Sequence, residues 1–294
     1  VIDPNSVALE LAQKRYEEMP SNSHVRSVNY HRDIPGLDGE VDLAILATNA
    51  ENRREIIENL LYKVRVNYLI LEKVVFQSVK DFEEIILILE ERKIKAWVNC
   101  PRRICSFFQE LRKETILSDS IKICVKGSSW GLASNTIHML DIFSFLSGQT
   151  NINIDYTDLD DEIYKSKRDG FVELGGRILA KTDRGDILEL VDDRKQDVSS
   201  QMSIKFNGNH FEIVQNQSLV RIFSQDGGKS NEIPFNMPLQ SNMTADVAEQ
   251  ILETGLSNLT PLNESYLLHR PMLDTFNAHL STILNRSVTI CPIT

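Results

Sequence analysis

About the first 100 residues alternate short apolar runs with amphipathic stretches, the pattern that strands and crossover helices of a parallel sheet produce. The predicted strands are Val41–Thr48, Val66–Leu71 and Ile94–Val98, and the predicted helices are Asn5–Glu18, Glu51–Leu61 and Asp81–Glu91. Strand–helix–strand connections of this kind cross over with one hand and place helices on both faces of the sheet. The expected fold of this part is therefore α/β, with a doubly wound parallel sheet.

The pattern changes after Pro101. From Asn151 to about Ser224 apolar and polar residues alternate with period two, and turn sequences at Asp183–Asp186 and Asn207–Asn209 punctuate the alternation. A large, mainly antiparallel sheet is expected there. Around it the sequence predicts the helices Arg102–Lys113, Asn135–Leu146, Thr244–Thr254 and Glu264–Leu284, the last interrupted near Pro271, and the strand Ser120–Lys126.

A chain of 294 residues is long enough for two domains at about 150 residues each. The change of pattern places the boundary near Asn99–Arg102. We therefore expect a dinucleotide-binding domain over residues 1–100 and an α+β domain for substrate binding and oligomerisation over residues 101–294.

The composition of the chain argues against several classes of function. The chain has 32 basic and 42 acidic side chains, a net charge of −10, and no run of lysine or arginine, which argues against a nucleic-acid partner. No apolar stretch approaches the ~20 residues of a membrane span, so we expect a soluble, cytoplasmic protein. The four cysteines form no CxxC pair and lie near no suitably spaced histidine, so neither a metal site nor a disulfide framework is expected.

The first candidates for binding and catalytic residues are those just after each predicted strand, because ligands of open α/β sheets bind beyond the carboxyl ends of the strands. Asp3 follows the apolar pair Val1–Ile2 and precedes a helix. An acid there can accept hydrogen bonds from both ribose hydroxyls of an adenosine and repel a 2′-phosphate, which favours NAD over NADP. Asp3 can equally be a helix cap, and the sequence leaves the two readings open.

Two further turns lie at strand ends. Ala47, Thr48 and Asn49 follow one predicted strand and could approach the ribose of a nicotinamide. Glu72 and Lys73 follow the next strand, where a lysine held in a cleft could stabilise negative charge on a substrate oxygen. A solvated charge pair is the alternative reading.

The segment 130–141 carries four polar side chains at helical spacing. Ser134, Asn135, His138 and Asp141 would share one helix face, opposite an apolar face. Histidine suits proton removal from an alcohol at neutral pH, and a carboxylate one turn on could orient it. A structural histidine in a helix is the alternative.

Taken in order, Asp3, Ala47–Asn49, Glu72–Lys73 and Ser134–Asp141 resemble the Gfo/Idh/MocA family of NAD(P)-dependent oxidoreductases, over essentially the whole chain. The resemblance implies a Rossmann-like first domain and hydride transfer between NAD or NADP and a hydroxyl or keto carbon of a sugar, polyol or nucleotide sugar. Lys73 matches the lysine of the family's Glu-Lys-Pro motif and His138 its substrate-side histidine. By the same resemblance, His138 takes the hydroxyl proton, Lys73 polarises the oxygen, and Asn135 is a third catalytic group.

The resemblance also implies further contacts. Arg102 would lie near the cofactor, as would Glu72, and Ser134 and Asp141 would bind substrate hydroxyls. Family members associate through the exposed face of the second sheet, so a homodimer or homotetramer is expected.

Three features depart from the family pattern. Val74 replaces the proline, Ser134 and Asn135 stand where an aspartate is usual, and the glycine-rich turn that would hold the pyrophosphate is not in the sequence. We expect that turn to precede Val1. A catalytically silent relative that binds a sugar or a dinucleotide is the competing hypothesis.

Overall fold

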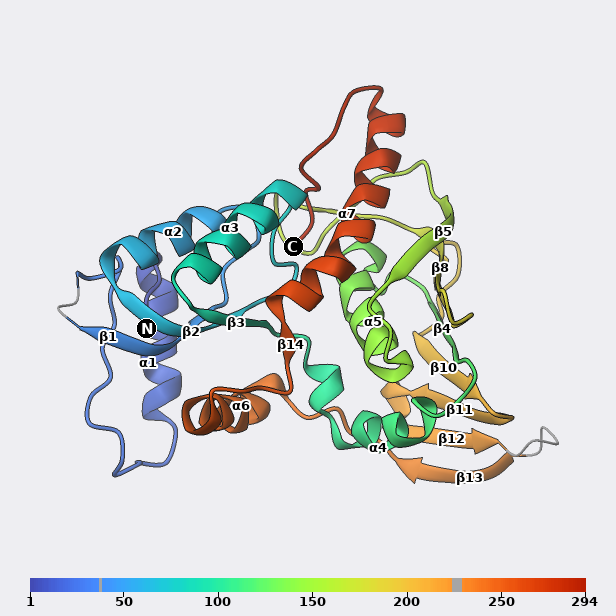
Figure 1. Cartoon of the computed structure of the whole chain (residues 1–294), viewed down its shortest axis with the longest axis horizontal. Coiled ribbons are helices and arrows are strands. Elements are labelled where there is room, and N and C mark those ends of the chain that lie inside the picture. Colours follow the sequence, from blue (N-terminus) through green and yellow to red (C-terminus); the bar gives the residue numbers. More distant parts are fainter. Residues whose placement is uncertain (37–38, 224–228) are drawn as a thin grey trace.

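The computed structural model describes residues 1–36, 39–223 and 229–294, and it contains two main sheets (Figure 1). The first sheet has the order β1-β2-β3-β14, and β1, β2 and β3 run parallel. Its strands are β1 (Glu40–Leu46), β2 (Arg65–Leu71), β3 (Lys95–Val98) and β14 (Thr260–Pro261). The predicted series of parallel strands and crossover helices is confirmed.

Helices cover both faces of this sheet. In Figure 1, α2 (Arg53–Lys63) and α3 (Val79–Glu91) lie above it, and α6 (Gln240–Thr254) lies below it. The helix α1 (Ser6–Glu17) overlaps the β1 end of the sheet in this view. The helix α6 comes from the C-terminal part of the chain and, with Leu259, packs on Ile70 and Trp97 of the first sheet. The chain therefore returns to the first sheet after leaving it.

The second sheet has eight strands in the order β13-β12-β11-β10-β4-β9-β8-β5. Neighbouring strands are antiparallel except β4 and β9, so the expected mainly antiparallel sheet is confirmed. Ser224, the expected end of the alternating region, lies outside the described residues. The strands are β4 (Lys122–Gly127), β5 (Ile152–Leu159), β8 (Gly176–Thr182), β9 (Ile187–Asp192), β10 (Gln201–Phe206), β11 (Asn209–Val214), β12 (Leu219–Phe223) and β13 (Lys229–Pro234).

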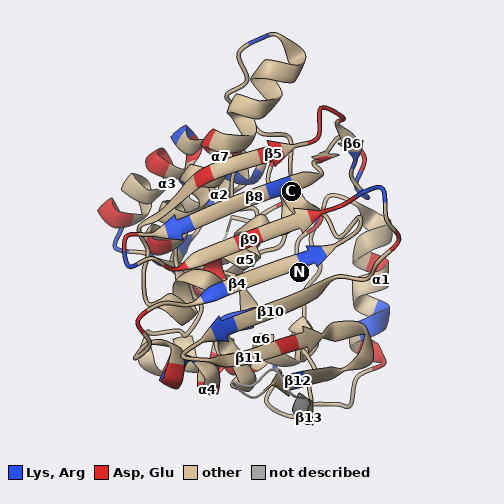
Figure 2. Cartoon of the chain, turned by 90° about the vertical axis from the view of Figure 1, so that its right-hand side faces the viewer, with Lys and Arg blue, Asp and Glu red and all other residues tan. Residues whose placement is uncertain are grey.

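One face of the second sheet carries helices and the other is open. The helices α4 (Ser106–Thr115), α5 (Leu132–Ser147) and α7 (Leu262–Leu284) lie between the two sheets (Figure 1). Figure 2 shows the open face, where charged residues of both signs occur along the strands. The apolar side chains of Ile204, Phe206 and Ile213 are buried beneath the helices, and the buried positions of β10 alternate with more exposed ones. Shorter elements are η1 (Pro101–Ile104), η2 (Gln215–Gln217), β6 (Tyr164–Lys165) and β7 (Val172–Glu173).

The predicted interruption of the last helix is wrong. The helix α7 continues through Pro271. Proline removes one hydrogen bond from the helix, but Leu268, Met272 and Leu273 around it are completely buried, and their packing keeps the segment helical.

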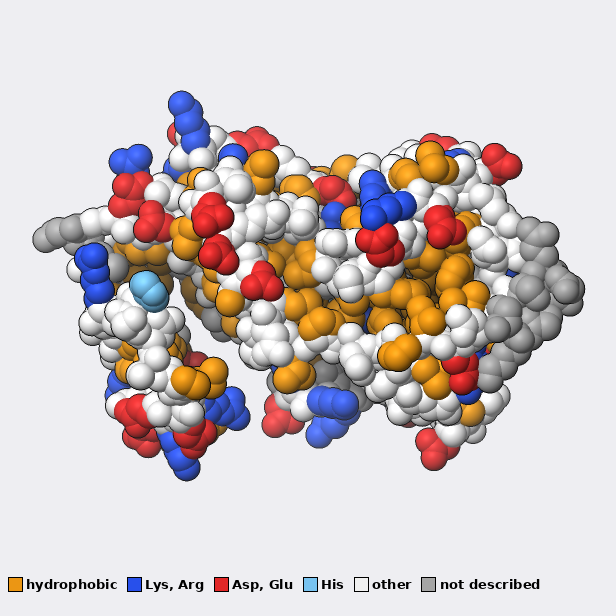
Figure 3. All heavy atoms as spheres, turned by 90° about the horizontal axis from the view of Figure 1, so that it is seen from below, with side chains coloured by type: hydrophobic (Ala, Val, Ile, Leu, Met, Phe, Trp, Pro, Cys, Tyr) orange, Lys and Arg blue, Asp and Glu red, His pale blue; other side chains and the backbone are white. Residues whose placement is uncertain are grey.

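Figure 3 views the molecule from below and shows hydrophobic side chains gathered along the middle of this face. The part at the left, which contains α1, stands apart from the rest in this view. Only Leu9 of α1 is buried, and Ile45 of β1 is 45% exposed. The lower side of the first sheet is thus less completely covered than the upper side. Within the described residues, no helix combines the length and apolarity that a membrane crossing requires.

Candidate active site

Lys73 lies at the carboxyl end of β2, where the first sheet meets α5. The backbone N–H of Glu72 donates to the carbonyl oxygen of Leu46 at 3.0 Å, and that of Asn99 donates to Leu71 at 2.8 Å, so the ends of three parallel strands are tied together. From there the Lys73 ammonium donates to the carbonyl oxygen of Ser134 at 3.0 Å. This bond directs the side chain across to the start of α5.

Arg53 holds the backbone around Lys73. Its guanidinium is 1% exposed and donates to the carbonyl oxygens of Glu72 at 2.8 Å and Val75 at 2.7 Å, and also to those of Val74 and Thr48. Burial lowers the pKa of Arg53 to about 10, which still leaves it charged at neutral pH. One cation therefore fixes the turn after β1 and the segment after β2 at once.

The residue after Lys73 departs from the family pattern, yet it is tightly held. Val74 is completely buried, and the Lys73–Val74 peptide bond is cis. On the far side of this segment, the backbone N–H of Val75 donates to Nε2 of His269 at 3.4 Å. His269 belongs to α7, is completely buried and contacts the Ser265 carbonyl through Nδ1 at 2.8 Å. Burial lowers the pKa of His269 to about 3, so its ring is neutral.

The Lys73 ammonium faces a cavity of about 410 Å³ between the first sheet, α5 and the β6–β7 hairpin. Burial lowers the pKa of Lys73, and the positive charge of Arg168 lowers it further. Trp130, Ser134 and Asn135 form the α5 side of the cavity, and Thr294 closes another side. The hairpin contributes Lys165, Ser166, Lys167, Arg168 and Glu173, and Arg194 completes the wall.

The C-terminal segment bridges the two halves of the site. The backbone N–H of Cys291 donates to the carbonyl oxygen of Gln77, and Val172 of β7 donates to Pro292, at 2.8 and 2.9 Å. The Thr294 hydroxyl accepts from the backbone N–H of Ala50 at 2.9 Å. These bonds link the first sheet to the hairpin that lines the cavity.

The start of α5 brings Ser134, Asn135 and His138 to the Lys73 side of the helix. Asn135 Nδ2 donates to the Trp130 carbonyl at 2.8 Å, which holds the amide against the cavity wall. His138 follows one turn later, and its Nδ1 is buried with no partner among the described residues. Burial lowers the pKa of His138 well below its ordinary value, and the charges of Arg102 and Lys73 contribute to the same shift. The imidazole is therefore neutral, and His138 is not among the residues that line the Lys73 cavity.

Asp141 does not join these groups. Its carboxylate is 1% exposed and accepts from Arg103 Nε at 3.1 Å and Nη2 at 2.7 Å, and from the Thr260 hydroxyl. Arg103 also pairs with Glu264 of α7 at 2.9 Å. Both oxygens of Asp141 are thus occupied by protein donors, in an ion pair that joins η1, α5 and α7.

The other expected ligands are spread around the first sheet. Ala47, Thr48 and Asn49 are exposed at the end of β1, although the carbonyl oxygen of Thr48 accepts from Arg53. Glu72 is tied down, because Oε1 accepts from Asn99 at 2.6 Å and from Gln240. Asp3 lies before α1, with Oδ1 accepting from the backbone N–H of Asn5 at 2.8 Å, and Asn5 rather than Asp3 caps the helix.

Arg102 lies on the second-sheet side of the Lys73 cavity rather than at a strand end of the first sheet. It lines a smaller cavity of about 190 Å³, which shares Trp130 and Asn135 with the Lys73 cavity. Its Nε is buried without a partner among the described residues, and burial lowers its pKa.

Sequence reasoning missed Arg53 and His269. Lys165 and Arg168 of the hairpin are candidates from the sequence to face a substrate, although nothing in their spacing supports that role. Arg53 left a signal, because it falls on the same helical face as the buried residues Ile57 and Leu60, where a charge requires a partner. His269 lies likewise among the apolar residues of α7. The sequence does not indicate that the hairpin lies near Lys73, because residue spacing along the chain does not show which distant segments meet in the fold.

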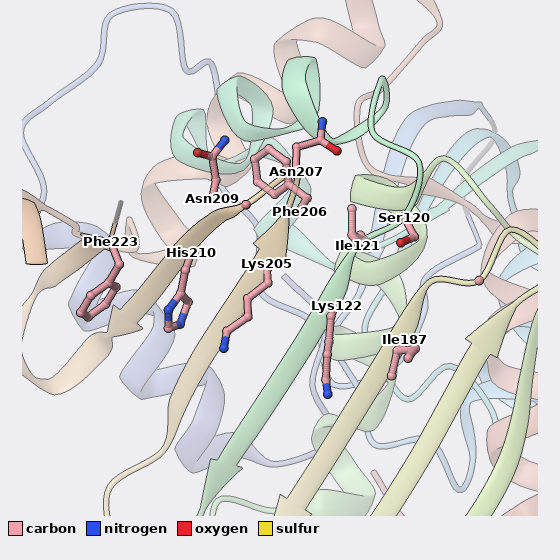
Figure 4. Close-up of a pocket in the computed structure, with 12 residues that line it drawn as sticks. Ser120, Ile121, Lys122, Ile187, Lys205, Phe206, Asn207, Asn209, His210 and Phe223 are labelled. Atoms are coloured by element: carbon pink, nitrogen blue, oxygen red, sulfur yellow. The ribbon is translucent and has the colours of Figure 1, made fainter. Parts of the chain in front are cut away.

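A separate hollow of about 450 Å³ lies on the open face of the second sheet, away from Lys73. Figure 4 shows Lys122, Lys205 and His210 on the neighbouring strands β4, β10 and β11 that line it. Its walls contain no group of the α5 or β2 site.

The nicotinamide half of a dinucleotide fits this geometry better than the pyrophosphate. Ala47 of the strand-end turn lines a cavity of about 330 Å³ together with Glu72, and Arg53 ties this turn to the segment that carries Lys73. Among the described residues, however, no glycine-rich turn follows a strand of the first sheet and opens a helix there, so the N–H groups that usually bind a pyrophosphate are not seen.

Comparison of the sequence with protein-family models finds no match, and comparison with curated proteins also finds none. Solved structures do match. An oxidoreductase from Agrobacterium radiobacter, in complex with NAD+, L-tartaric acid and magnesium, has a TM-score of 0.66 at 15% identity, over 98% of this chain and 89% of that chain. A Gfo/Idh/MocA family oxidoreductase from Vibrio cholerae has a TM-score of 0.63 at 14% identity, over 97% and 90%.

A third matched structure is not named as an oxidoreductase. The super-repressor mutant of Gal80p from Saccharomyces cerevisiae matches with a TM-score of 0.59 at 11% identity, over 84% of this chain and 79% of that chain. At these identities the likeness concerns the fold. The chain has the two-part architecture of these proteins, with a parallel sheet followed by a large open sheet.

Proposed function

We propose that this protein is an oxidoreductase of the Gfo/Idh/MocA family. It transfers a hydride between NAD or NADP and a hydroxyl or keto carbon of a sugar, polyol or nucleotide sugar. The observation that carries the proposal is the Lys73 ammonium, held at the end of a parallel strand and aimed at a cavity that Ser134 and Asn135 line. The shared fold supports it, since the Agrobacterium oxidoreductase was solved with NAD+.

The protein's own groups divide the work of alcohol oxidation. Neutral His138 accepts the hydroxyl proton, with Asn135 and Ser134 orienting the substrate hydroxyls. The Lys73 ammonium stabilises the negative charge that develops on the oxygen, and it is strengthened in this role by its partial burial. A nicotinamide, when bound, supplies the acceptor for the carbon-bound hydrogen and its electron pair.

Ala47, Thr48 and Asn49 would hold the nicotinamide end, and Glu72 would contribute to the same side through its fixed carboxylate. Arg102 is assigned to the cofactor by family resemblance, but its position supports a substrate contact equally well. Asp3 favours NAD over NADP if it meets the adenosine ribose. Asp141 has no place in this proposal, because its oxygens are already occupied.

The experiment is a titration of the protein with NADH and NADPH, followed by a screen of sugars and polyols for reduction of NAD+ or NADP+. The wild type should bind NADH and turn over at least one substrate. Lys73→Met should bind NADH like the wild type and lose turnover by about a hundredfold or more. Lys95→Met is the matched control, because Lys95 also donates to a backbone carbonyl, that of Gly255 at 2.9 Å, but far from the cavity. Unchanged turnover in Lys73→Met contradicts the assignment.

A catalytically silent protein that binds a sugar or a dinucleotide is the second candidate. One observation favours it: one of the matched structures is a Gal80p super-repressor mutant. Under this hypothesis a sugar or NADH binds, but no substrate in the screen yields reduced cofactor. The same titration and screen therefore separate the two candidates.

Association through the open face of the second sheet is a further part of the proposal. This face is uncovered in Figure 2 and carries pairs such as Arg177–Glu189 at 2.7 Å and Lys181–Asp155 at 3.1 Å. A second copy could complement such a mixed-charge surface in a homodimer or homotetramer. Light scattering at micromolar concentration should give a dimer or tetramer mass, and Lys205→Glu should weaken it. A monomer mass for the wild type contradicts the proposed association.

A further inference from the structure

The Lys73 cavity is strongly basic, although the chain as a whole has a net charge of −10. Five cations contribute to its wall, and Glu173 is the only acidic side chain among the lining residues. The cations are Lys73, Lys165, Lys167, Arg168 and Arg194. A concentration of one charge sign in a cavity attracts ligands of the other sign.

Glu173 offsets only part of this positive charge, because its single carboxylate, which acts to raise the pKa of Lys73, faces five cations. Its carboxylate is 7% exposed, and Oε2 accepts from the backbone N–H groups of Ala133 at 3.0 Å and Ser134 at 3.4 Å. It therefore balances the positive N-terminal end of α5. The neighbouring carboxylate of Glu72 is bound by Asn99 and Gln240.

Three of the cations have no acidic partner among the described residues. Arg194 lies 3.4 Å from Asp192 and stacks over the ring of Tyr164, so its charge is partly compensated. Lys165, Lys167 and Arg168 form no ion pair with a described carboxylate. The positive charge of Arg168 also lowers the pKa of Lys73, which means that the two cations repel each other across the cavity. An anion between them would relieve this repulsion.

The hairpin that carries these cations is braced at its base. Ser166 donates to the carbonyl oxygen of Phe171 at 3.1 Å, and Phe171 donates to that of Arg168 at 3.3 Å. Phe171 is buried, and Val172 is bonded to Pro292 of the C-terminal segment. The hydrogen-bonded base of the hairpin thus holds the cations at its tip near Lys73.

From this arrangement we infer that the substrate is an acidic sugar or polyol, whose carboxylate or phosphate lies against Lys167 and Arg168 while its reacting hydroxyl meets Lys73. The inference rests on the proposed function for the identity of the reacting group. The binding of the anionic group does not depend on hydride transfer and can be measured without it.

The test uses three six-carbon probes at constant ionic strength: D-gluconate, D-glucitol 6-phosphate and neutral D-glucitol. Binding is followed by the fluorescence of Trp130, which lines the cavity, and by calorimetry. At least one anionic probe should bind about tenfold or more tightly than D-glucitol. Whichever anion binds more tightly identifies the group as carboxylate or phosphate.

The variant Lys167→Ala/Arg168→Ala should weaken the anionic probe by about tenfold or more and leave D-glucitol unchanged. The matched control is Lys14→Ala/Arg15→Ala, which removes the same charge from the exposed end of α1. Equal affinity for neutral and anionic probes, or an unchanged affinity in the cavity variant, overturns the inference. So does binding of inorganic phosphate as tight as that of the sugar phosphate, which indicates an adventitious ion only.

Competition with NADH separates this inference from the proposed function. If the cavity variant loses NADH affinity and D-gluconate displaces NADH, the cations bind cofactor phosphates and the inference fails. If anionic probes bind through the hairpin but no substrate reduces NAD+ or NADP+, the charge inference stands and the oxidoreductase proposal fails. If neutral polyols are oxidised and anionic probes do not bind, the oxidoreductase proposal stands and the charge inference fails.

Discussion

Arg53 lies behind Lys73 and binds the backbone carbonyl oxygens on both sides of it, those of Glu72 and Val74. A fully buried guanidinium with only carbonyl partners is uncommon, because a charge in the interior requires several hydrogen bonds to offset its desolvation. Here those bonds hold the one segment that carries the proposed catalytic lysine. Arg53 is therefore a positioning residue.

The first prediction concerns Arg53→Lys. A lysine keeps the charge but cannot reach four carbonyl oxygens with a planar fork. We expect kcat to fall by about tenfold to a hundredfold with KM changed much less, and the free energy of unfolding to fall by about 2–4 kcal/mol. Steady-state kinetics and urea unfolding measure both. Arg92→Lys, which affects a single bond to the Leu61 carbonyl, is the control. A destabilised Arg53→Lys with wild-type kcat contradicts the positioning role.

The second prediction concerns His138 as the proton acceptor. Since burial lowers its pKa well below the ordinary value, His138 stays neutral over the usual assay range. The acidic limb of kcat/KM should therefore lie well below pH 6.5, the ordinary value for histidine. His138→Asn should reduce kcat/KM by about a hundredfold or more. His210→Asn, on the open sheet face, should not. An inflection near pH 6.5 that persists in His138→Asn assigns it to another group.

The third prediction distinguishes the structural from the substrate role of Asp141. Asp141→Asn leaves Arg103 buried without its bidentate partner, so the free energy of unfolding should fall by about 3–5 kcal/mol. The KM of the folded variant should be unchanged. Glu264→Gln, which removes the more exposed partner of Arg103, should cost less. A stable Asp141→Asn enzyme with a strongly raised KM restores Asp141 as a substrate ligand.

The fourth prediction concerns the stability contribution of His269. Its pKa is about 3 in the folded protein and about 6.5 when unfolded. As pH falls, the unfolded chain therefore binds a proton at His269 before the folded protein does. The contribution of neutral His269 to the free energy of unfolding is complete above pH 6.5 and is lost progressively toward pH 3. Relative to pH 7.5, the wild type should lose about 2 kcal/mol from this group at pH 5. Urea unfolding of His269→Gln should show a correspondingly shallower pH dependence. Identical pH dependences in the two proteins rule out this linkage.

Much of the architecture could be predicted from local pattern. The strands around Leu46, Leu71 and Val98 are short apolar runs separated by amphipathic helices, and this pattern has one common solution in a parallel sheet. Lys73 and Ser134 could be proposed for the same reason, since a strand end and a helix start are visible in sequence. The second sheet could be predicted from the period-two pattern of apolar and polar residues and from the turn sequences between its strands.

Other features could not be predicted in this way. The helix α7 runs through Pro271 because its buried neighbours outweigh one missing hydrogen bond. Asp141 shares a helical face with His138, but a partner 38 residues away, Arg103, draws its carboxylate into the interior. The return of α6 to the first sheet likewise depends on contacts between distant parts of the chain.

The sequence by itself determined the two kinds of sheet, the order of their elements, and the strand end and helix that carry Lys73 and His138, because periodicity and strand-end chemistry are local properties. Only the tertiary structure decided that Arg53 holds the Lys73 segment, that Asp141 is an ion-pair residue, and that the β6–β7 hairpin brings its cations to the cavity. These arrangements arise when groups far apart in sequence must satisfy buried charges and hydrogen bonds together. No local pattern records which distant partner does so.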